Sequence, residues 1–327
     1  MKWLIYALGG GLGHLTRSLA LARTAGRQGI ECTILSNSPG IRWVPASREL
    51  QPTGRLIEIA SDADRDAVAR EVQSVLSSVD FDVLVVDTFP RGLGGELVKL
   101  LPDIRTPKVL VHRDLNPRYV EQYDLGDFVR SYDCLLMPGE TGPLHQHPNA
   151  IMTSHWLIRD ADELLSREAA RKELLERDAD GHPVVIVSGS GRAEEVRKMH
   201  GLADEFCEQF RGEAHVCFVG PGAGRAPVWP LLSLMNGVDI VVGAGGYNTV
   251  SETRATKTPL LAVAQPRLYD RQDMRLKSTE RVETYGEFRP RLSGLLVRHR
   301  FTGTAGFVNG THLAVDTVQR LISGPVK

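Results

Sequence analysis

Short apolar runs that alternate with longer helical patterns most constrain what this chain can fold into. Runs such as DVLVVD at Asp82–Asp87 and PVVIVS at Pro183–Ser188 are apolar at consecutive positions, so each strand must be covered on both faces. Strands of that kind belong to parallel sheets whose two faces pack against helices. The regular alternation of strand and helix therefore predicts an α/β protein made of doubly wound units.

The predicted strands fall into two series, separated by a charged segment at roughly Asp160–Arg177 that is predicted to be helical. The first series is Trp3–Leu8, Glu31–Leu35, Leu56–Ala60, Asp82–Asp87, Lys108–Arg113, Cys134–Pro138 and Ala150–Ser154; the second is Pro183–Ser188, His215–Gly220, Asp239–Gly243 and Leu260–Ala264. A chain of 327 residues is long enough for two domains. We therefore place one Rossmann-like domain at residues 1–156 and another at 157–327, with a last helix at about 312–323.

Charge and cysteine usage argue against several classes of function. The formal net charge is -1, so no excess of positive charge points to nucleic acid or to an acidic membrane surface. No window approaches the ~18 apolar residues of a membrane span, and the N-terminus reads as a first strand rather than a signal peptide. The 4 cysteines form no C-x-x-C pair and are predicted to be buried and reduced. We expect a cytoplasmic protein with no nucleic-acid partner and no integral membrane segment; its oligomeric state is left open.

A glycine-rich loop, Gly9–His14 (GGGLGH), follows the first predicted strand and leads into a helix. Such a turn offers free N–H groups and the positive end of the helix dipole to an anion, and Gly11 and Gly13 would let a ligand approach the backbone. The loop lacks both the G-x-G-x-x-G spacing of dinucleotide-binding proteins and the lysine of a P-loop. It therefore predicts either a phosphate-binding turn of another kind or a turn that presents His14; a plain tight turn is the structural alternative.

His14 is the leading candidate for a catalytic base. An imidazole with a reference pKa of about 6.5 suits proton transfer near neutral pH, although a structural histidine at a helix start is the alternative. Arg17, one turn later, is expected to face a phosphate or solvent. Asp87 and Asp114 end predicted strands and are alternative bases, because doubly wound sheets bind ligands at those ends. We predict no metal, since we find no Asp-x-Asp pair placed after a predicted strand (Asp62-x-Asp64 lies in a polar turn) and no His/Cys ligand set is present.

A second glycine-rich turn, Gly243–Gly246, lies between a predicted strand and a predicted helix, so it repeats the arrangement of the first. Thr249 and Glu252 fit the Thr-x-x-Glu capping box, and the functional alternative for Glu252 is a ligand of ribose hydroxyls. Two polar loops also follow predicted strands in this half of the chain. Each is either a ligand-binding loop or an ordinary solvated loop. One contains Ser188, Ser190 and Gly191, which could close over phosphates, and the other contains Asp270, Arg271 and Gln272, which could bind a sugar.

These motifs resemble those of a known family. The Gly-x-Gly-His-x-x-Arg pattern of the first loop is similar to the N-terminal motif of GT-B glycosyltransferases, especially the group that includes the lipid II N-acetylglucosaminyltransferase and the UDP-sugar hydrolase of pseudaminic acid synthesis. The second half resembles that group's donor-binding signature at Asp239, Gly243, Gly245, Gly246, Thr249, Glu252, Pro259, Asp270, Arg271 and Gln272. One departure is Leu276, which stands where that group often has asparagine.

The resemblance implies a GT-B fold: two Rossmann-like domains with an interdomain cleft, and a final helix that packs back on the N-terminal domain. It implies that Glu252 holds the ribose of a nucleotide-diphosphate sugar and that His14 faces the acceptor. The residues implied at the phosphates are Ser190, Gly191, Gly246, Asn248 and Thr249, and those implied at the sugar are Asp270, Arg271 and Gln272.

The predicted function is therefore a metal-independent, inverting glycosyl transfer from a UDP-sugar to a small-molecule acceptor. The UDP-sugar is a co-substrate, and no cofactor is expected. Hydrolysis of a nucleotide sugar is the first alternative, because His14 could activate water in the same site. A ligand-binding relative without catalysis and an epimerase are further alternatives.

Overall fold

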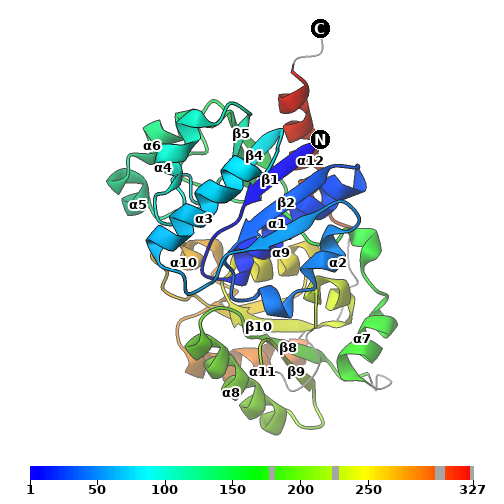
Figure 1. The fold of residues 1–327 in the computed structure, drawn as a ribbon. Helices are drawn as coiled ribbons and strands as arrows, with labels where there is room; N and C mark the ends of the chain where they lie inside the picture. The colour runs from blue at the N-terminus through cyan, green and yellow to red at the C-terminus, as the bar shows by residue number, and fades with distance from the viewer. Residues whose placement is uncertain (177–180, 223–227, 299–305, 325–327) are drawn as a thin grey trace. The chain divides into compact units, whose positions relative to one another are not determined.

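The computed structural model describes residues 1–176, 181–222, 228–298 and 306–324, and the chain divides into two units (Figure 1). Unit 1 contains Met1–Ile158, Leu268–Asp270 and Asn309–Lys327, and unit 2 contains Arg159–Arg267 and Arg271–Val308. Two later segments of the chain therefore belong to unit 1: the last helix, which was expected to pack on the N-terminal domain, and Leu268–Asp270, which was not.

Unit 1 is built on a sheet of seven parallel strands in the order β3-β2-β1-β4-β5-β6-β7. The strands are β1 (Lys2–Tyr6), β2 (Glu31–Ser36), β3 (Arg55–Glu58), β4 (Val83–Asp87), β5 (Lys108–Val111), β6 (Cys134–Pro138) and β7 (Ala150–Thr153). The order reverses between β1 and β4, which lie side by side (Figure 1). Doubly wound sheets bind ligands at the carboxyl ends of the strands that flank such a reversal.

The main helices of unit 1 pack on this sheet through apolar stripes, as α3 shows. In α3 the buried residues Val68, Val72 and Val75 recur at helical spacing and join the core cluster that contains Leu84 and Val86 of β4. The elements are α1 (Leu12–Arg27), η1 (Ile41–Trp43), α2 (Ala46–Leu50), α3 (Arg65–Ser78), α4 (Leu97–Leu100), η2 (Leu101–Asp103), α5 (Pro117–Gln122), α6 (Leu125–Phe128), η3 (Val129–Ser131) and α12 (Gly310–Ser323).

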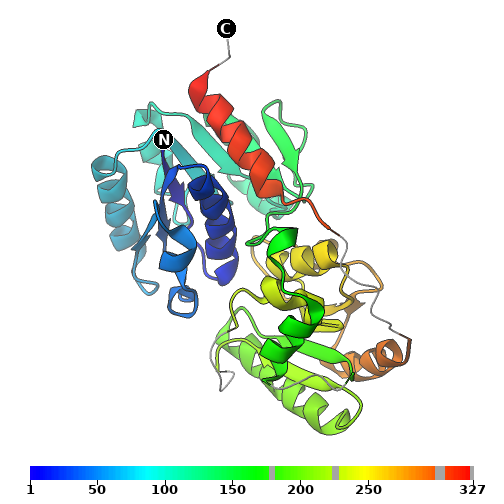
Figure 2. The same ribbon diagram turned by 90° about the vertical axis from the view of Figure 1, so that its right-hand side faces the viewer.

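The last helix, α12, belongs to unit 1 and packs beside α1 and β7 (Figure 2). Asn309 caps the helix and also exchanges two hydrogen bonds with the backbone of Leu157, at 2.8 and 3.1 Å. A Cβ on Gly310 would collide with the backbone of Ser154, so only glycine allows this close approach. The helix begins two residues before its predicted start at residue 312 because Asn309 provides the cap.

Unit 2 is built on a sheet of five parallel strands in the order β12-β11-β10-β8-β9. The strands are β8 (Val184–Ser188), β9 (His215–Val219), β10 (Ile240–Ala244), β11 (Leu260–Val263) and β12 (Arg281–Val282). The order reverses between β8 and β10. The pattern did not predict β12, since its two residues are too few to show a strand period.

The helices of unit 2 surround a core that contains Val185, Phe206 and Phe288. The elements are η4 (Ala161–Glu163), α7 (Arg167–Leu175), α8 (Ala193–Gln209), η5 (Leu231–Gly237), α9 (Tyr247–Thr256), α10 (Gln272–Arg275), η6 (Tyr285–Glu287) and α11 (Phe288–Arg298). The predicted continuous helix Asp160–Arg177 is wrong: η4 and α7 are separate, because Ser166 caps a new helix by accepting from the N–H of Ala169. Arg177 lies outside the described residues.

The cysteine prediction is partly wrong. Cys32 and Cys134 are buried, but Cys207 is exposed and Cys217 is only half-buried, and all four are free thiols. No helix among the described residues combines the length and the apolar character that crossing a membrane would require.

Asp239, which the resemblance includes in the donor-binding signature, lies at the opposite end of β10 from the glycine turn. Its carboxylate accepts from Arg167 at 2.7 Å and from Arg171 at 2.6 Å, and it also accepts from the backbone N–H of Val184 at 2.7 Å. Asp239 is buried. It therefore joins α7 to the amino ends of β8 and β10, which is a structural role.

We expect Asp239→Ala to lower the free energy of unfolding by about 3–5 kcal/mol, because it leaves the buried guanidinium of Arg171 without its carboxylate. The matched control is Glu283→Ala, since Glu283 forms an exposed ion pair with Arg281 and should cost less than about 1 kcal/mol. Urea denaturation followed by circular dichroism measures both. Equal denaturation midpoints for the two variants would show that Asp239 does not stabilise unit 2 in this way.

Candidate active site

The first glycine loop connects β1 to α1 at the carboxyl end of the unit 1 sheet. The N–H of Gly9 donates to Asn37 Oδ1 at 2.8 Å, and Ser38 Oγ donates to the carbonyl of Gly11 at 3.2 Å, so residues after β2 hold the loop. A Cβ on Gly9 would collide with the His14 imidazole, whereas Gly11 and Gly13 leave open space at that position. The loop is therefore a close-approach turn at Gly9, and Gly11 and Gly13 remain free for the approach of a ligand.

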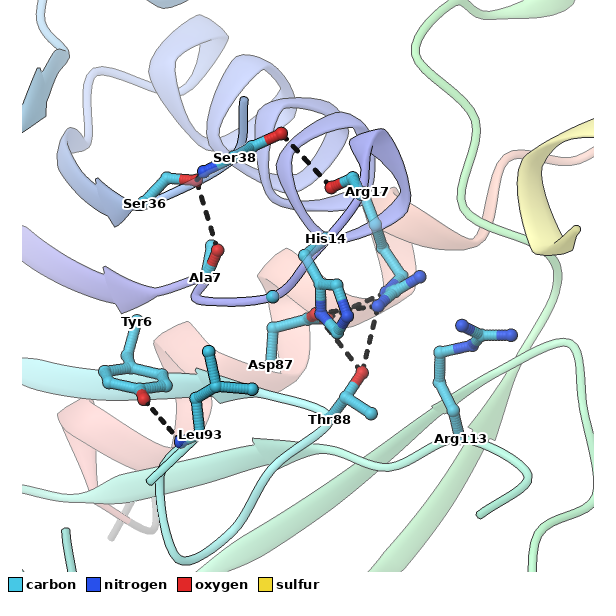
Figure 3. A network of polar contacts seen from close by, with 12 residues as sticks. Tyr6, Ala7, His14, Arg17, Ser36, Ser38, Asp87, Thr88, Leu93 and Arg113 are labelled. Carbon is cyan, nitrogen blue, oxygen red and sulfur yellow. Dashed lines mark hydrogen bonds and ion pairs between the residues drawn. The ribbon is translucent and has the colours of Figure 1, made fainter. Parts of the chain in front are cut away.

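His14 and Asp87 come together across the reversal of strand order. His14 lies in the first turn of α1, and Asp87 ends β4, the parallel neighbour of β1. His14 Nδ1 lies 2.6 Å from Asp87 Oδ2 (Figure 3). The imidazole ring also stacks on Phe89, with 5.3 Å between centroids. The side chain of His14 is 15% exposed to solvent. A histidine held by a buried carboxylate and still open to solvent is an arrangement suited to proton transfer.

Asp87 is held as an ion by its neighbours. Burial alone would raise the pKa of this carboxyl, but Arg17 and then His14 more than offset it and hold the pKa well below its usual range. Both carboxylate oxygens are engaged, by Arg17 Nε at 2.8 Å and by Arg17 Nη2 and His14 Nδ1 at 2.6 Å. An acceptor with a lowered pKa and occupied oxygens is a poor base, so this geometry favours a positioning role for Asp87.

The alternative in which Arg17 faces solvent is wrong. The Arg17 side chain is 0% exposed and points back at Asp87 and Thr88 (Figure 3). Its spacing of three residues from His14 places both side chains on one face of α1, but that face is covered by the end of β4. Asp114, the other predicted base, is buried beyond the end of β5, and the carboxylate that binds His14 is that of Asp87.

Thr88 and Phe89, which the sequence analysis did not select, complete this end of β4. Thr88 has a φ of 71°, in the left-handed region that a β-branched residue rarely adopts, and its N–H donates to the carbonyl of Val111 at 2.9 Å. Strained backbone of this kind tends to occur at functional sites. Nothing in the local sequence signals a positive φ at a threonine, so only the structure reveals it.

A second polar group missed by the sequence analysis lies at the ends of β5 and β6. Arg113 Nη2 lies 3.3 Å from Glu140 Oε2 and 3.5 Å from Asp270 Oδ1. Arg113 and Glu140 are buried. Arg113 could have been found, because it is a charged residue at the carboxyl end of a predicted buried strand.

An aromatic cluster extends from Phe89 away from His14. Tyr269 lies edge-on to Phe89 with centroids 5.3 Å apart, Tyr119 lies 4.6 Å from Tyr269, and Tyr123 lies 5.1 Å from Tyr119. All four rings belong to unit 1, because the segment Leu268–Asp270 forms an antiparallel bridge to Leu115. Burial raises the pKa of Tyr119 to about 12, so its hydroxyl stays protonated near neutral pH.

The second glycine turn, like the first, lies at the carboxyl end of a strand that flanks the reversal of strand order in its unit. β8 ends at Ser188 and its neighbour β10 ends at Ala244, so the Ser188–Gly191 loop and the Gly245–Thr249 turn start from strands that flank the reversal. Gly246 is the N-cap of α9 and provides no side-chain cap. The first-turn N–H groups of α9 are therefore placed to meet an anion.

The capping-box interpretation of Thr249 and Glu252 is wrong. Because Gly246 is the N-cap, Thr249 is the third helical residue and Glu252 lies in the second turn. Burial raises the pKa of Glu252 to about 8. Within the part of the chain that the structure describes, its carboxyl group has no hydrogen bond or ion pair, so it is available to a ligand.

The remaining predicted residues of unit 2 have mixed surroundings. Ser190 and Gly191 are exposed, and Asn248 is partly buried. Gly191 has a φ of 122°, and a Cβ there would collide with Glu195, whose carboxylate forms two 2.6 Å bonds to Arg267. Glycine is thus required at this position for the loop to turn.

Asp270, Arg271 and Gln272 do not act as one group. Asp270 belongs to unit 1 and contacts Arg113, whereas Arg271 and Gln272 belong to unit 2. Gln272 is buried, and its Oε1 accepts from the N–H of Gln265 at 3.0 Å, so part of its hydrogen-bonding capacity supports the loop. A Cβ on Gly245 would lie 3.1 Å from both the Gln272 carbonyl and Leu276, which explains the glycine by packing.

Comparison with known proteins identifies the fold. The chain is similar to the glycotransferase of kitacinnamycin (TM-score 0.60, 15% identity, 98% of this chain and 99% of that one). It is also similar to the spinosyn rhamnosyltransferase SpnG complexed with thymidine diphosphate (0.58, 16%, 99% and 96%). A third similar structure is the UDP-GlcNAc 2-epimerase from Methanocaldococcus jannaschii (0.58, 14%, 98% and 99%). No protein-family model matches the chain, and no curated protein does.

These likenesses, together with the two parallel sheets of seven and five strands, confirm the predicted fold class. The chain has the GT-B fold, with two Rossmann-like α/β units. At this level of identity the comparison establishes the fold and not the reaction.

Proposed function

We propose that the protein is an inverting glycosyltransferase that moves a sugar from a nucleoside-diphosphate donor to a small-molecule acceptor, without a metal or another cofactor. The observation that carries the proposal is the 2.6 Å contact between His14 Nδ1 and Asp87 Oδ2 at the carboxyl edge of unit 1. Support also comes from the similar structures, several of which are described as glycosyltransferases.

In the proposed reaction His14 is the general base. Its Nδ1–H donates to Asp87, which leaves the lone pair of Nε2 for the acceptor hydroxyl proton. As that proton moves to Nε2, the acceptor oxygen forms a bond to the anomeric carbon. The bond from that carbon to the diphosphate breaks, and its electron pair leaves with the diphosphate. The acceptor oxygen attacks the face opposite the leaving group, so the anomeric configuration inverts.

Unit 2 would bind the donor. The N–H groups at the start of α9 would stabilise the charge that develops on the diphosphate, with the Ser188, Ser190 and Gly191 loop beside them. Glu252 would accept from the ribose hydroxyls. We favour a UDP-sugar from the motif resemblance, and the same resemblance favours the group that contains the lipid II N-acetylglucosaminyltransferase and the pseudaminic acid UDP-sugar hydrolase.

The test is nucleotide release from a panel of UDP-, dTDP- and GDP-sugars, with and without a cell extract as the source of acceptor. Transfer predicts release that depends on the extract, and a product with inverted anomeric configuration by NMR. Release in buffer alone would instead favour hydrolysis, with His14 activating water. Conversion of UDP-GlcNAc into an epimer would favour the reaction of the structurally similar epimerase. The absence of both nucleotide binding and turnover would refute the proposal.

The close approach of the His14 imidazole to Gly9 leads to a further prediction. We expect Gly9→Ala to lower kcat by about 10²-fold or more, because the new methyl group displaces the imidazole that Asp87 otherwise holds. Nucleotide affinity should be unchanged, since the nucleotide is assigned to unit 2. The control is Gly126→Ala in α6 of unit 1, where a Cβ meets open space. Steady-state kinetics measures both variants, and a wild-type kcat for Gly9→Ala would contradict the assignment of His14.

A further inference from the structure

We propose that Arg17 is a positioning residue that neutralises and orients the Asp87 carboxylate, so that Asp87 accepts the hydrogen bond of His14 without drawing a second proton onto the imidazole. The inference rests on the proposed function, which assigns His14 as the general base. The arrangement that supports it is a buried group of three charged or titratable side chains, Arg17, Asp87 and His14, all within unit 1 (Figure 3).

Arg17 and Asp87 form a two-point ion pair. Arg17 Nε donates to Oδ1 at 2.8 Å, and Nη2 donates to Oδ2 at 2.6 Å. The exposed fractions of the two side chains are 0% and 1%, so water and salt do not screen the pair. The geometry matches the planar fork of a guanidinium to a carboxylate, which fixes the plane of Asp87 and hence the direction in which Oδ2 meets His14.

The charge of this group explains the proposed effect on His14. With a neutral imidazole, the charges of Arg17 and Asp87 cancel. Protonation of His14 would place a second positive charge beside the carboxylate that Arg17 already pairs with, which is unfavourable. In a histidine–aspartate pair without arginine, the same proton would meet an uncompensated carboxylate and would be favoured. Arg17 therefore reduces the attraction of Asp87 for a proton on His14 while keeping Asp87 as a hydrogen-bond acceptor.

Thr88 links the members of the group. Its Oγ1 accepts from Arg17 Nη2 at 3.0 Å and donates to Asp87 Oδ2 at 3.2 Å. Its backbone has a φ of 71° and is held by the hydrogen bond from its N–H to Val111. A strained residue that is fixed by β5 and bonded to both partners indicates that the positions of Arg17 and Asp87 are specified by the fold.

The other titratable groups at this edge do not replace Arg17. His112 is buried, and burial, with a smaller contribution from Arg113, lowers its pKa to about 4, so it is neutral. Arg113 pairs with Glu140 and Asp270. Asp114 is buried after β5, and the aromatic Phe89 packs on the other side of the His14 ring. Arg17 is the cation that contacts the carboxylate partner of His14.

The test is an NMR titration of the His14 imidazole, using protein labelled at histidine, in the wild type and in Arg17→Gln. We expect the midpoint of protonation to rise by about one to two pH units in Arg17→Gln, because the positive charge next to Asp87 is lost. Arg17→Lys should retain most of the wild-type behaviour. The matched control is Arg23→Gln, which removes another ion-paired arginine of α1, paired with Glu49 at 3.2 Å, and should leave the midpoint unchanged. The acidic limb of the kcat/KM profile should move by the same amount as the midpoint.

Coincident midpoints for the wild type and Arg17→Gln, or a lower midpoint in the variant, would overturn the inference. If Arg17→Gln does not fold, the ¹⁵N shifts of wild-type His14 decide the matter: a neutral ring protonated at Nδ1 at pH 7 is expected, and a doubly protonated ring overturns the inference. The titration needs no substrate. A midpoint shift without turnover of any nucleotide sugar would therefore reject the proposed function and leave the role of Arg17 standing.

Discussion

We expect Asp87→Asn to lower kcat by about 10³- to 10⁴-fold. Loss of the corresponding carboxylate in histidine-based catalytic triads has an effect of this size. An asparagine can present its amide NH₂ to His14 Nδ1. The imidazole would then carry its proton on Nε2. That nitrogen could no longer accept the proton of the acceptor hydroxyl. Steady-state kinetics with the donor identified by the nucleotide-sugar screen measures the effect.

The same kinetics on His14→Ala and on the double variant tests whether the two residues act as a unit. His14→Ala should abolish turnover with nucleotide affinity near normal, and adding Asp87→Asn to it should cause little further loss, because effects within one catalytic unit are not additive. The matched control is Asp82→Asn, at the exposed amino end of β4, whose carboxylate accepts from the N–H of Lys2. A folded Asp87→Asn or His14→Ala variant with a full rate would reject the base assignment and make Asp114 the next candidate.

Glu252→Gln should weaken nucleoside-diphosphate binding by about 10- to 100-fold, the range for losing hydrogen bonds to a charged group. The free carboxyl has a pKa raised to about 8 by burial, so it is largely protonated at pH 7. Ribose hydroxyls that donate to the ionised form would lower this pKa, and nucleotide binding at pH 7 would release a proton. Calorimetry in buffers of different ionisation enthalpy measures this release.

In the wild type the nucleotide affinity should therefore rise with pH between about 6 and 9, and it should be flat in Glu252→Gln. The control is Glu194→Gln, an exposed residue of α8 that pairs with Lys198. If Glu252→Gln binds nucleotide as tightly as the wild type and with the same proton release, Glu252 does not contact the ribose.

The raised pKa of Glu252 also has a consequence for stability. Because the folded pKa, about 8, lies above the ordinary value of 4.5, the protonated carboxyl stabilises the folded state fully below pH 4.5, and this contribution is lost as pH rises through 8. Relative to Glu252→Gln, the wild type should lose stability on the order of a few kcal/mol between these limits. Thermal unfolding of both proteins across that range measures the difference.

The strand pattern predicted the elements well because the fold depends on burial, and buried runs are visible in a sequence. The Asp82–Asp87 run is observed as β4 (Val83–Asp87), which is buried throughout and apolar up to Val86, and the last helix differs from its prediction by only a few residues. The separate η4 and α7 were missed, since a cap at Ser166 interrupts a charged segment whose composition favours a helix throughout. Local hydrogen bonds of this kind leave little trace in apolar periodicity.

The site was predicted only in part, because the sequence pattern shows local features but not contacts between distant residues. His14 was selected because it follows a glycine turn at a strand end, which is a local feature. The spacing of Arg17 could suggest a solvent-facing or ligand-facing side chain but not its burial against Asp87, which comes 70 residues later. Asp270 and Gln272 are two residues apart in sequence and belong to different units, because the bridge to Leu115 binds only Leu268–Asp270 to unit 1.

The sequence by itself determined the class of fold, the two glycine turns and His14, because each depends on residues that are neighbours along the chain. Only the tertiary structure decided that β1 lies beside β4, and therefore that Asp87 and Arg17 become the partners of His14. The physical reason is that strand order is set by how helices cover both faces of a sheet, a non-local packing condition that no short pattern encodes. The same condition placed β8 beside β10 and left the carboxyl of the half-buried Glu252 without a hydrogen-bonding partner among the described residues.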